Sequence, residues 1–189
     1  MIRRIPALIE SWRGTPIRRA LHTDKFYING EWRAPARLSS PATRTVSDPA
    51  TGESLATLAL GSSMDVDAAV ESAFAAFDSW SASSKAERLV LLERLLGLYK
   101  DAMPEMAEII SSEMGAPIRL AKSAQAMAGL GHIQTAIRVL SDFDFEERHS
   151  ARETLRYEAV GVCGCITPWN CASTAIEPHA WPRPQRPCG

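Results

Sequence analysis

Residues 157–170 read YEAVGVCGCITPWN, and this stretch decides the fold class. Residues 159–167 carry no charge, which is typical of a strand buried on both faces, as in a parallel sheet covered by helices. Pro168 ends the run. Ligands in open α/β sheets bind beyond the carboxyl ends of the strands, so residues 168–170 stand where a ligand site is expected. The stretch therefore predicts an α/β protein with a site at this loop.

Two side chains of this loop are candidate site residues. Trp169 offers a flat apolar wall, and the amide N–H of Asn170 is suited to donate to a developing oxyanion. A tryptophan in a loop packs more often than it takes part in chemistry. Three residues alone therefore leave both interpretations open.

The preceding residues predict a second kind of strand. Residues 151–158, ARETLRYE, alternate between polar and apolar, as a half-exposed strand does. An edge strand without a neighbour is a template for pairing with another chain. We therefore expect pairing with a second copy or an intact homologue through the strand from Arg152 to Glu158.

Helices are predicted between residues 62 and 143. Ser62 and Ser84 each precede an acidic residue at the third helical position, which is the pattern of a capping box. Proline suits the first turn of a helix, so Pro104 predicts the start of a third helix and Pro117 the start of a fourth. Gly115 is expected to end the third. The apolar stripes of these segments are read as core.

Short antiparallel strands are predicted before the helices. The stretch KFYINGEW, residues 25–32, alternates around Asn29-Gly30, which is a strong signal for a two-residue hairpin. A second turn is expected over residues 48–52.

Composition limits the class of partner. The chain has 189 residues, 21 basic and 22 acidic side chains and a net charge of -1, which gives no electrostatic drive toward nucleic acid or a membrane surface. No apolar run approaches the length of a bilayer span. We expect a cytoplasmic protein that binds neither nucleic acid nor membrane.

The four cysteines all lie near the end of the sequence, at positions 163, 165, 171 and 188. Cys163 and Cys165 are two residues apart, so on a strand they share one face. No metal site is predicted, because histidine and acidic ligands at regular spacing are not evident. We interpret the cysteines as buried or incidental thiols in a reducing compartment.

Five motifs together resemble the aldehyde dehydrogenase superfamily. They are KFYINGEW, DPATGE, EMGAP, GLGH and YEAVGVCGCITPWN, in that order, over about Asp24 to Asn170. The resemblance implies an α/β fold with N-terminal β-hairpins, a helical bundle and only the first strand of a Rossmann-like sheet. It also implies aldehyde oxidation with NAD or NADP. Ile166, Thr167 and Trp169 would lie along the cofactor, and Asn170 would stabilise the oxyanion of the thiohemiacetal. Residues 142–158 would include part of the oligomerisation strands.

The sequence also departs from that family. Residues 171–189 contain Pro178, Pro182, Pro184 and Pro187 in place of the expected helix. The family's nucleophilic Cys, its general-base Glu and the Lys and Glu that hold the ribose have no counterpart, and none of the cysteines falls at the position of the nucleophile. We therefore expect an inactive, truncated aldehyde dehydrogenase that binds no cofactor stably. The alternative is a non-catalytic module that pairs with a full-length homologue.

The two ends are assigned separately from residues 24–170. Residues 1–23 are rich in Arg and poor in acids, which fits a targeting peptide. The favoured interpretation is a disordered extension, or a start site placed too far upstream, because Pro6, Gly14 and Pro16 interrupt any long helix. Residues 171–189 are interpreted as a disordered tail translated out of frame, since GC-rich codons read in another frame yield Pro, Arg and Ala.

Overall fold

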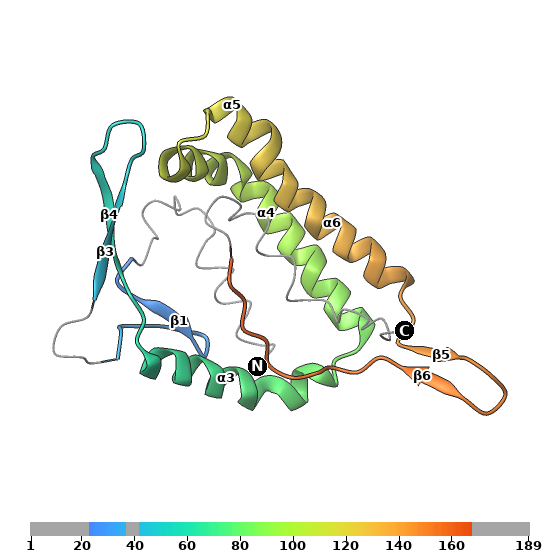
Figure 1. Cartoon of the computed structure of the whole chain (residues 1–189). Coiled ribbons are helices and arrows are strands. Elements are labelled where there is room, and N and C mark those ends of the chain that lie inside the picture. The colour runs from blue at the N-terminus through green and yellow to red at the C-terminus, as the bar shows by residue number, and fades with distance from the viewer. Residues whose placement is uncertain (1–22, 37–41, 168–189) are drawn as a thin grey trace, which may run out of the picture.

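The computed structural model describes residues 23–36 and 42–167. The interpretations of residues 1–22, of Pro168, Trp169 and Asn170, and of the tail at 171–189 lie outside the described residues. The described part contains two N-terminal hairpins, a set of helices and a third hairpin (Figure 1).

The first hairpin joins β1 (Phe26–Ile28) to β2 (Glu31–Arg33). Asn29 and Gly30 both have positive φ, at 55° and 79°, as a type I′ turn requires. Across the strands, the rings of Tyr27 and Trp32 meet edge to face at 5.3 Å. The predicted Asn-Gly hairpin is confirmed.

The second hairpin joins β3 (Thr43–Ser47) to β4 (Ser54–Ala59). Its turn is organised by Asp48, whose Oδ1 accepts from the backbone N–H groups of Ala50 and Thr51. Gly52 supplies a φ of 75° and donates its N–H to the Asp48 carbonyl. The predicted turn at residues 48–52 is confirmed.

Helix α3 (Ser63–Ser81) begins with the predicted capping box. The side chain of Ser62 accepts from the Asp65 N–H, and the Asp65 carboxylate accepts from the Ser62 N–H at 2.8 Å. The same carboxylate also accepts from the N–H of Ala36 at 2.7 Å. Asp65 therefore connects the residues after the first hairpin to the start of α3 through hydrogen bonds.

Helix α4 (Lys85–Met114) also begins with its predicted box, from Ser84 and Glu87, and ends at Gly115 in the left-handed conformation. The predicted helix start at Pro104 is wrong, because Pro104 lies inside this continuous helix. A proline inside a helix removes one backbone hydrogen bond and costs about 3 kcal/mol. Tyr99 on one side of the proline and Ile110 on the other are both buried, so packing holds the two halves in one helix.

The predicted fourth helix begins at Pro117 as expected but is not uniform. It comprises α5 (Ile118–Leu120), the π-helical turn η2 (Ala121–Gln125) and α6 (Ala126–Asp142). Ala121 and Ala126 are both fully buried. In a regular α-helix they would point about 140° apart, at 100° per residue. The π turn, with its hydrogen bonds from i to i+5, places both on the buried face.

The core lies where α4, η2 and α6 pack together. It is built from small and flexible side chains: Ala107, Ile110, Ala116, Ala121 and Ala126, flanked by Met103, Met106 and Met114. Figure 1 shows α4 and α6 running side by side along most of their length. Lys85, at the start of α4, donates to the carbonyls of Ser141 and Phe143, so the two helices are antiparallel.

The third hairpin, β5 (Glu146–Arg148) with β6 (Thr154–Arg156), projects from the end of α6 (Figure 1). The strand predicted over residues 151–158 is confirmed for the three residues of β6, but the predicted burial of one face is wrong, because the apolar Leu155 is 48% exposed. All six residues of the hairpin strands are exposed.

The segment after the third hairpin corrects the central prediction from the sequence. Residues 159–167 form no strand, and Val160 and Ile166 are 86% and 102% exposed. The prediction of a strand buried on both faces is therefore wrong for the described chain, which has hairpins and helices but no Rossmann-like strand. A strand exists only through hydrogen bonds to neighbouring strands, and none of the described strands pairs with this segment.

Candidate functional site

The predicted site residues fall at the boundary of the described chain. Ile166 and Thr167 are the described pair, and both are exposed, Ile166 completely. Trp169 and Asn170 lie outside the described residues. The structure therefore does not bring the four candidates together within its described part.

Cofactor binding can be tested against these two residues. A dinucleotide site buries most of its ligand against walls of side chains and backbone. The complete exposure of Ile166 means that the described residues place no wall over it. The described residues alone therefore form no enclosed site around Ile166, and the predicted cofactor contacts of Ile166 and Thr167 stay predictions.

Two carboxyl groups have shifted pKa values, and both belong to helix starts. The Ser62 backbone N–H, followed by the Ala36 N–H and the Ser62 hydroxyl, lowers the pKa of Asp65. The Ser84 backbone N–H and then its hydroxyl lower the pKa of Glu87. A general acid or base near neutral pH needs its carboxyl pKa raised. Asp65 and Glu87 are therefore structural.

An aromatic cluster closes the base of the third hairpin. The ring of Phe143 lies 4.9 Å from that of Phe145 and 5.1 Å from that of Tyr157, both edge to face. The Arg88 guanidinium lies 5.4 Å from the centre of the Phe145 ring. This cluster was not predicted from the sequence, although Phe143 and Phe145, two residues apart, are a signal for aromatic side chains that share one side of the chain.

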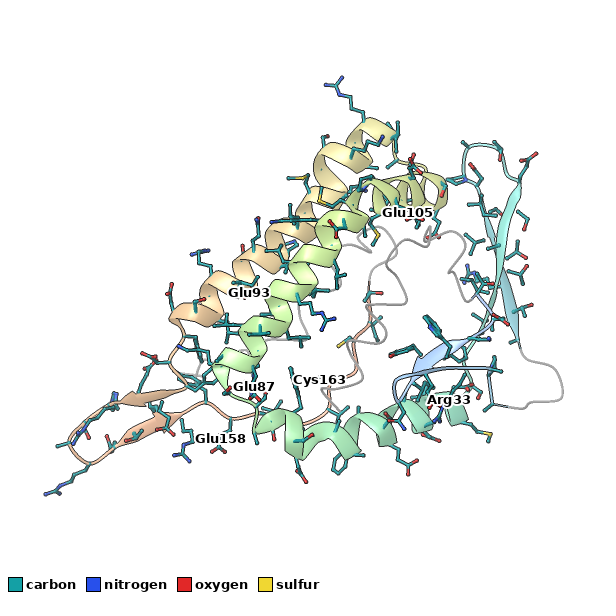
Figure 2. The ribbon with its side chains drawn as sticks, turned by 180° about the vertical axis from the view of Figure 1, so that it is seen from behind. Arg33, Glu87, Glu93, Glu105, Glu158 and Cys163 are labelled. Atoms are coloured by element: carbon teal, nitrogen blue, oxygen red, sulfur yellow. The ribbon has the colours of Figure 1, made fainter. Side chains whose placement is uncertain are left out.

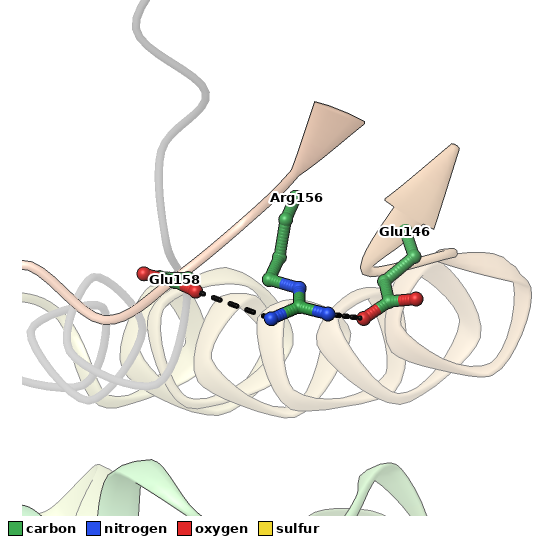
Figure 3. Close-up of polar contacts among 3 residues, drawn as sticks. All are labelled: Glu146, Arg156 and Glu158. Atoms are coloured by element: carbon green, nitrogen blue, oxygen red, sulfur yellow. Dashed lines mark ion pairs between the residues drawn. The ribbon is translucent and has the colours of Figure 1, made fainter. Parts of the chain in front are cut away.

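Charged residues extend from that cluster along the hairpin. Arg156 Nη2 lies 2.7 Å from Glu146 Oε1 on the opposite strand, and Arg156 Nη1 lies 3.9 Å from Glu158 Oε1 (Figure 3). These side chains are more than half exposed, so each ion pair contributes about 0–1 kcal/mol. Glu146 and Arg156 are directly opposed across the hairpin, and the two pairs form no enclosed site.

The thiols of the candidate region are exposed, so the interpretation that they are buried is wrong for Cys163 and Cys165, and the alternative of incidental thiols stays open. Cys163 and Cys165 both lie at the surface, and Figure 2 shows Cys163 away from the packed helices α4 and α6. Their exposure has the same cause as that of Ile166, namely that no described strand pairs with residues 159–167. Within the described ranges, histidine, cysteine and carboxylate side chains form no group of three suited to a metal ion.

Comparisons with known proteins identify the class. Residues 37–179 match the model of the aldehyde dehydrogenase family. A 3-succinoylsemialdehyde-pyridine dehydrogenase from a Pseudomonas species is 44% identical over 147 residues, which are 77% of this chain and 30% of that protein. The fold and these matches define a protein of the dehydrogenase class.

Solved structures of aldehyde dehydrogenases are also similar to this chain. An aldehyde dehydrogenase from Bartonella henselae is 41% identical with a TM-score of 0.75, over 80% of this chain and 32% of that one. An aldehyde dehydrogenase from Pseudomonas syringae, solved with NAD+ and octanal, is 39% identical with a TM-score of 0.77, over 82% and 31%. The chain belongs to the aldehyde dehydrogenase family. It spans about 30% of the length of the curated relatives it matches.

The match to the family model extends further along the chain than the motifs quoted from the sequence. It continues to residue 179, past Asn170, where the sequence analysis places the last family residue. The family similarity therefore does not by itself mark Cys171 as the point where the reading frame changes.

Proposed function

We propose that these 189 residues are the N-terminal part of an NAD(P)-dependent aldehyde dehydrogenase, an oxidoreductase that converts an aldehyde to a carboxylic acid. The observation that carries the proposal is the family match over residues 37–179. The similar Pseudomonas syringae structure, which contains NAD+ and octanal, supports an aldehyde as the substrate class.

The proposed roles of individual residues follow from the family motif. Asn170 donates its amide N–H to the oxyanion that develops on the aldehyde oxygen, where a fixed donor stabilises the transition state. Ile166, Thr167 and Trp169 lie along the cofactor in the complete enzyme. The nucleophile and the general base are not assigned to any residue of this chain.

We further propose that the 189-residue chain alone neither oxidises aldehydes nor holds NAD or NADP stably. The exposure of Ile166 supports this. Loss of a nucleophile alone costs about a million-fold in kcat in a serine protease.

The test is an aldehyde oxidation assay with each nicotinamide cofactor, followed at the absorbance of the reduced form. We expect the rate of the buffer blank, with no heat of cofactor binding in calorimetry. Asn170→Ala is the matched variant. Turnover above the blank that disappears in this variant would refute the inactivity and assign the chemistry to Asn170.

We also propose that residues 171–189 are translated out of frame. The change in character after Asn170 supports this, with four prolines in the last twelve residues. Sequencing the gene beyond the stop codon tests it. Another frame should encode a helix, the ribose-binding Lys and Glu and a nucleophilic Cys. If no frame encodes these, the proposal is wrong.

A second candidate function is pairing with an intact relative. The observation that favours it is the two-stranded hairpin of β5 and β6, whose strands are exposed throughout and include Leu155 at 48% exposure. Exposed strand edges pair readily with other strands. We propose that the strand from Arg152 to Glu158 pairs with an intact homologue or a second copy.

Binding to a full-length homologue separates this candidate from the first. Saturable binding without turnover is expected, and Leu155→Asp should weaken it by about tenfold or more, because a buried leucine contributes about 1.5–3 kcal/mol. Val90→Asp, on exposed α4 surface, is the control. Equal binding by both variants would exclude the hairpin as the interface.

None of the helices in the described ranges is long and apolar enough to cross a membrane. We propose the cytoplasm as the compartment, and fractionation of cells that express the tagged protein tests it.

A further inference from the structure

Two exposed thiols stand two residues apart, and the proposed function uses neither. Cys163 and Cys165 lie on either side of Gly164, in the segment 159–167 that forms no helix or strand. Among the described residues, no backbone hydrogen bond joins this segment to another. Its backbone is therefore able to adjust without breaking secondary structure.

The spacing fits a disulfide. Two residues along a strand-like chain span at most about 6.6 Å between Cα atoms, at about 3.3 Å per residue. A disulfide accepts Cα separations of about 4.4–6.8 Å, so the bond lies near the upper end of the range and closes with a small bend. In the structure each sulfur lies near the carbonyl oxygen two residues before it, Cys165 Sγ at 3.7 Å from the Cys163 oxygen and Cys163 Sγ at 4.0 Å from the Gly161 oxygen, so the exposed Cys163 side chain must rotate toward Cys165 for the bond to form.

Gly164 makes the bend accessible. A Cβ built at this position would meet nothing within 4 Å, so the surrounding structure leaves room for the backbone to move. Glycine also has the widest choice of backbone conformations. The thiols thus have proximity, exposure and a hinge between them.

We propose that Cys163 and Cys165 form a redox-active dithiol that exchanges with small-molecule disulfides such as oxidised glutathione. In the first step one cysteine thiolate attacks a glutathione sulfur. A cysteine–glutathione bond forms, the glutathione disulfide bond breaks and one reduced glutathione leaves. The second cysteine then attacks its neighbour's sulfur, which closes the Cys163–Cys165 bond and releases a second reduced glutathione. Two electrons and two protons pass from the dithiol to the oxidised glutathione.

The same geometry makes the exchange reversible. The bond would lie at the surface, as its two cysteines do, and exposed disulfides are the more oxidising and labile ones. The Cys163–Cys165 bond should therefore form and reopen within the range of glutathione buffers, in contrast to a structural disulfide.

The test uses the 189-residue chain with Cys171→Ser and Cys188→Ser, so that the thiols under study are the remaining pair. The protein is equilibrated in buffers with graded ratios of reduced to oxidised glutathione, quenched with acid and alkylated. It is then digested, and the mass of the peptide that contains both cysteines is measured by mass spectrometry. We expect a reversible change from two alkyl groups to none, with the mass of two hydrogens lost. Full alkylation at every ratio, or a dimer on a non-reducing gel, would overturn the proposal.

Cys163→Ser in the same background is the matched control. It should give a stable cysteine–glutathione adduct and no internal bond, with the helical circular dichroism signal unchanged, because the segment lies outside the packed helices. If this variant accumulates no more of the adduct than its parent, the second thiol is not resolving the first and the proposal fails. Neither readout depends on aldehyde oxidation, so a failure here leaves the proposed dehydrogenase ancestry untouched.

Discussion

The hydroxyl of Tyr99 connects the middle of α4 to the start of α6, and its removal tests how the π turn is held. The side chain is 5% exposed, and its oxygen donates to the Ala126 carbonyl at 2.9 Å. Ala126 is fully buried and follows the π turn directly. Tyr99→Phe removes this donor and keeps the ring that packs in the core.

The expected cost follows from what each group loses. A typical intramolecular hydrogen bond contributes about 0.5–1.5 kcal/mol net, with values clustering around 1 kcal/mol. We expect about 1 kcal/mol less free energy of unfolding. With a urea slope of about 2 kcal/mol per molar, this lowers the midpoint by roughly 0.5 M.

The assay is urea unfolding of the 189-residue chain, followed by helical circular dichroism at low protein concentration. Tyr99→Ala should cost about 3–5 kcal/mol, as other buried aromatic truncations do. Tyr27→Phe, at a ring that is 38% exposed, should change stability by less than about 0.5 kcal/mol. An unchanged midpoint for Tyr99→Phe, or a loss equal to that of Tyr99→Ala, would refute the assignment of this energy to the hydroxyl.

Four further predictions concern the helix caps, the interior of α4 and the exposed surface. Gly115→Ala should destabilise the chain by about 1–2 kcal/mol from its left-handed φ alone, and by more because the new Cβ would lie 2.7 Å from Pro49 Cγ. Gly97→Ala, where a Cβ meets nothing within 4 Å, should instead stabilise α4 by about 0.8–1 kcal/mol in the same melts. The pKa values of Asp65 and Glu87 are lower in the folded than in the unfolded chain, so both carboxylates stabilise the fold at any pH above the ordinary carboxyl pKa. This contribution should disappear as the pH falls through the pKa values of the folded state. Asp65→Asn with Glu87→Gln should flatten that acid limb, and an unaltered pH profile of the melting temperature would contradict it. The exposed apolar residues of α3 and of residues 159–167 should bind an environment-sensitive dye and promote aggregation; a soluble monomer with a sharp melt and no dye signal would show this to be wrong.

The sequence by itself determined the features that depend on near neighbours along the chain. The Asn29-Gly30 turn and both capping boxes are set by residues two to three positions apart, so their geometry is local and the motifs predict them. Family membership was also readable, because the motifs keep their order across most of the chain. Asn170 and Trp169 remain predictions from that resemblance.

Tertiary structure decided the features that depend on partners distant in sequence. Pro104 was read as a helix start, yet packing of Tyr99 and Ile110 keeps α4 continuous through it. The π turn is likewise fixed by the need to bury both Ala121 and Ala126 against α4. Residues 159–167 show the converse: their apolar composition predicts a buried strand, but a strand forms only where neighbouring strands accept its hydrogen bonds. Composition records how a segment is suited to pack, whereas burial depends on the segments that are present to cover it.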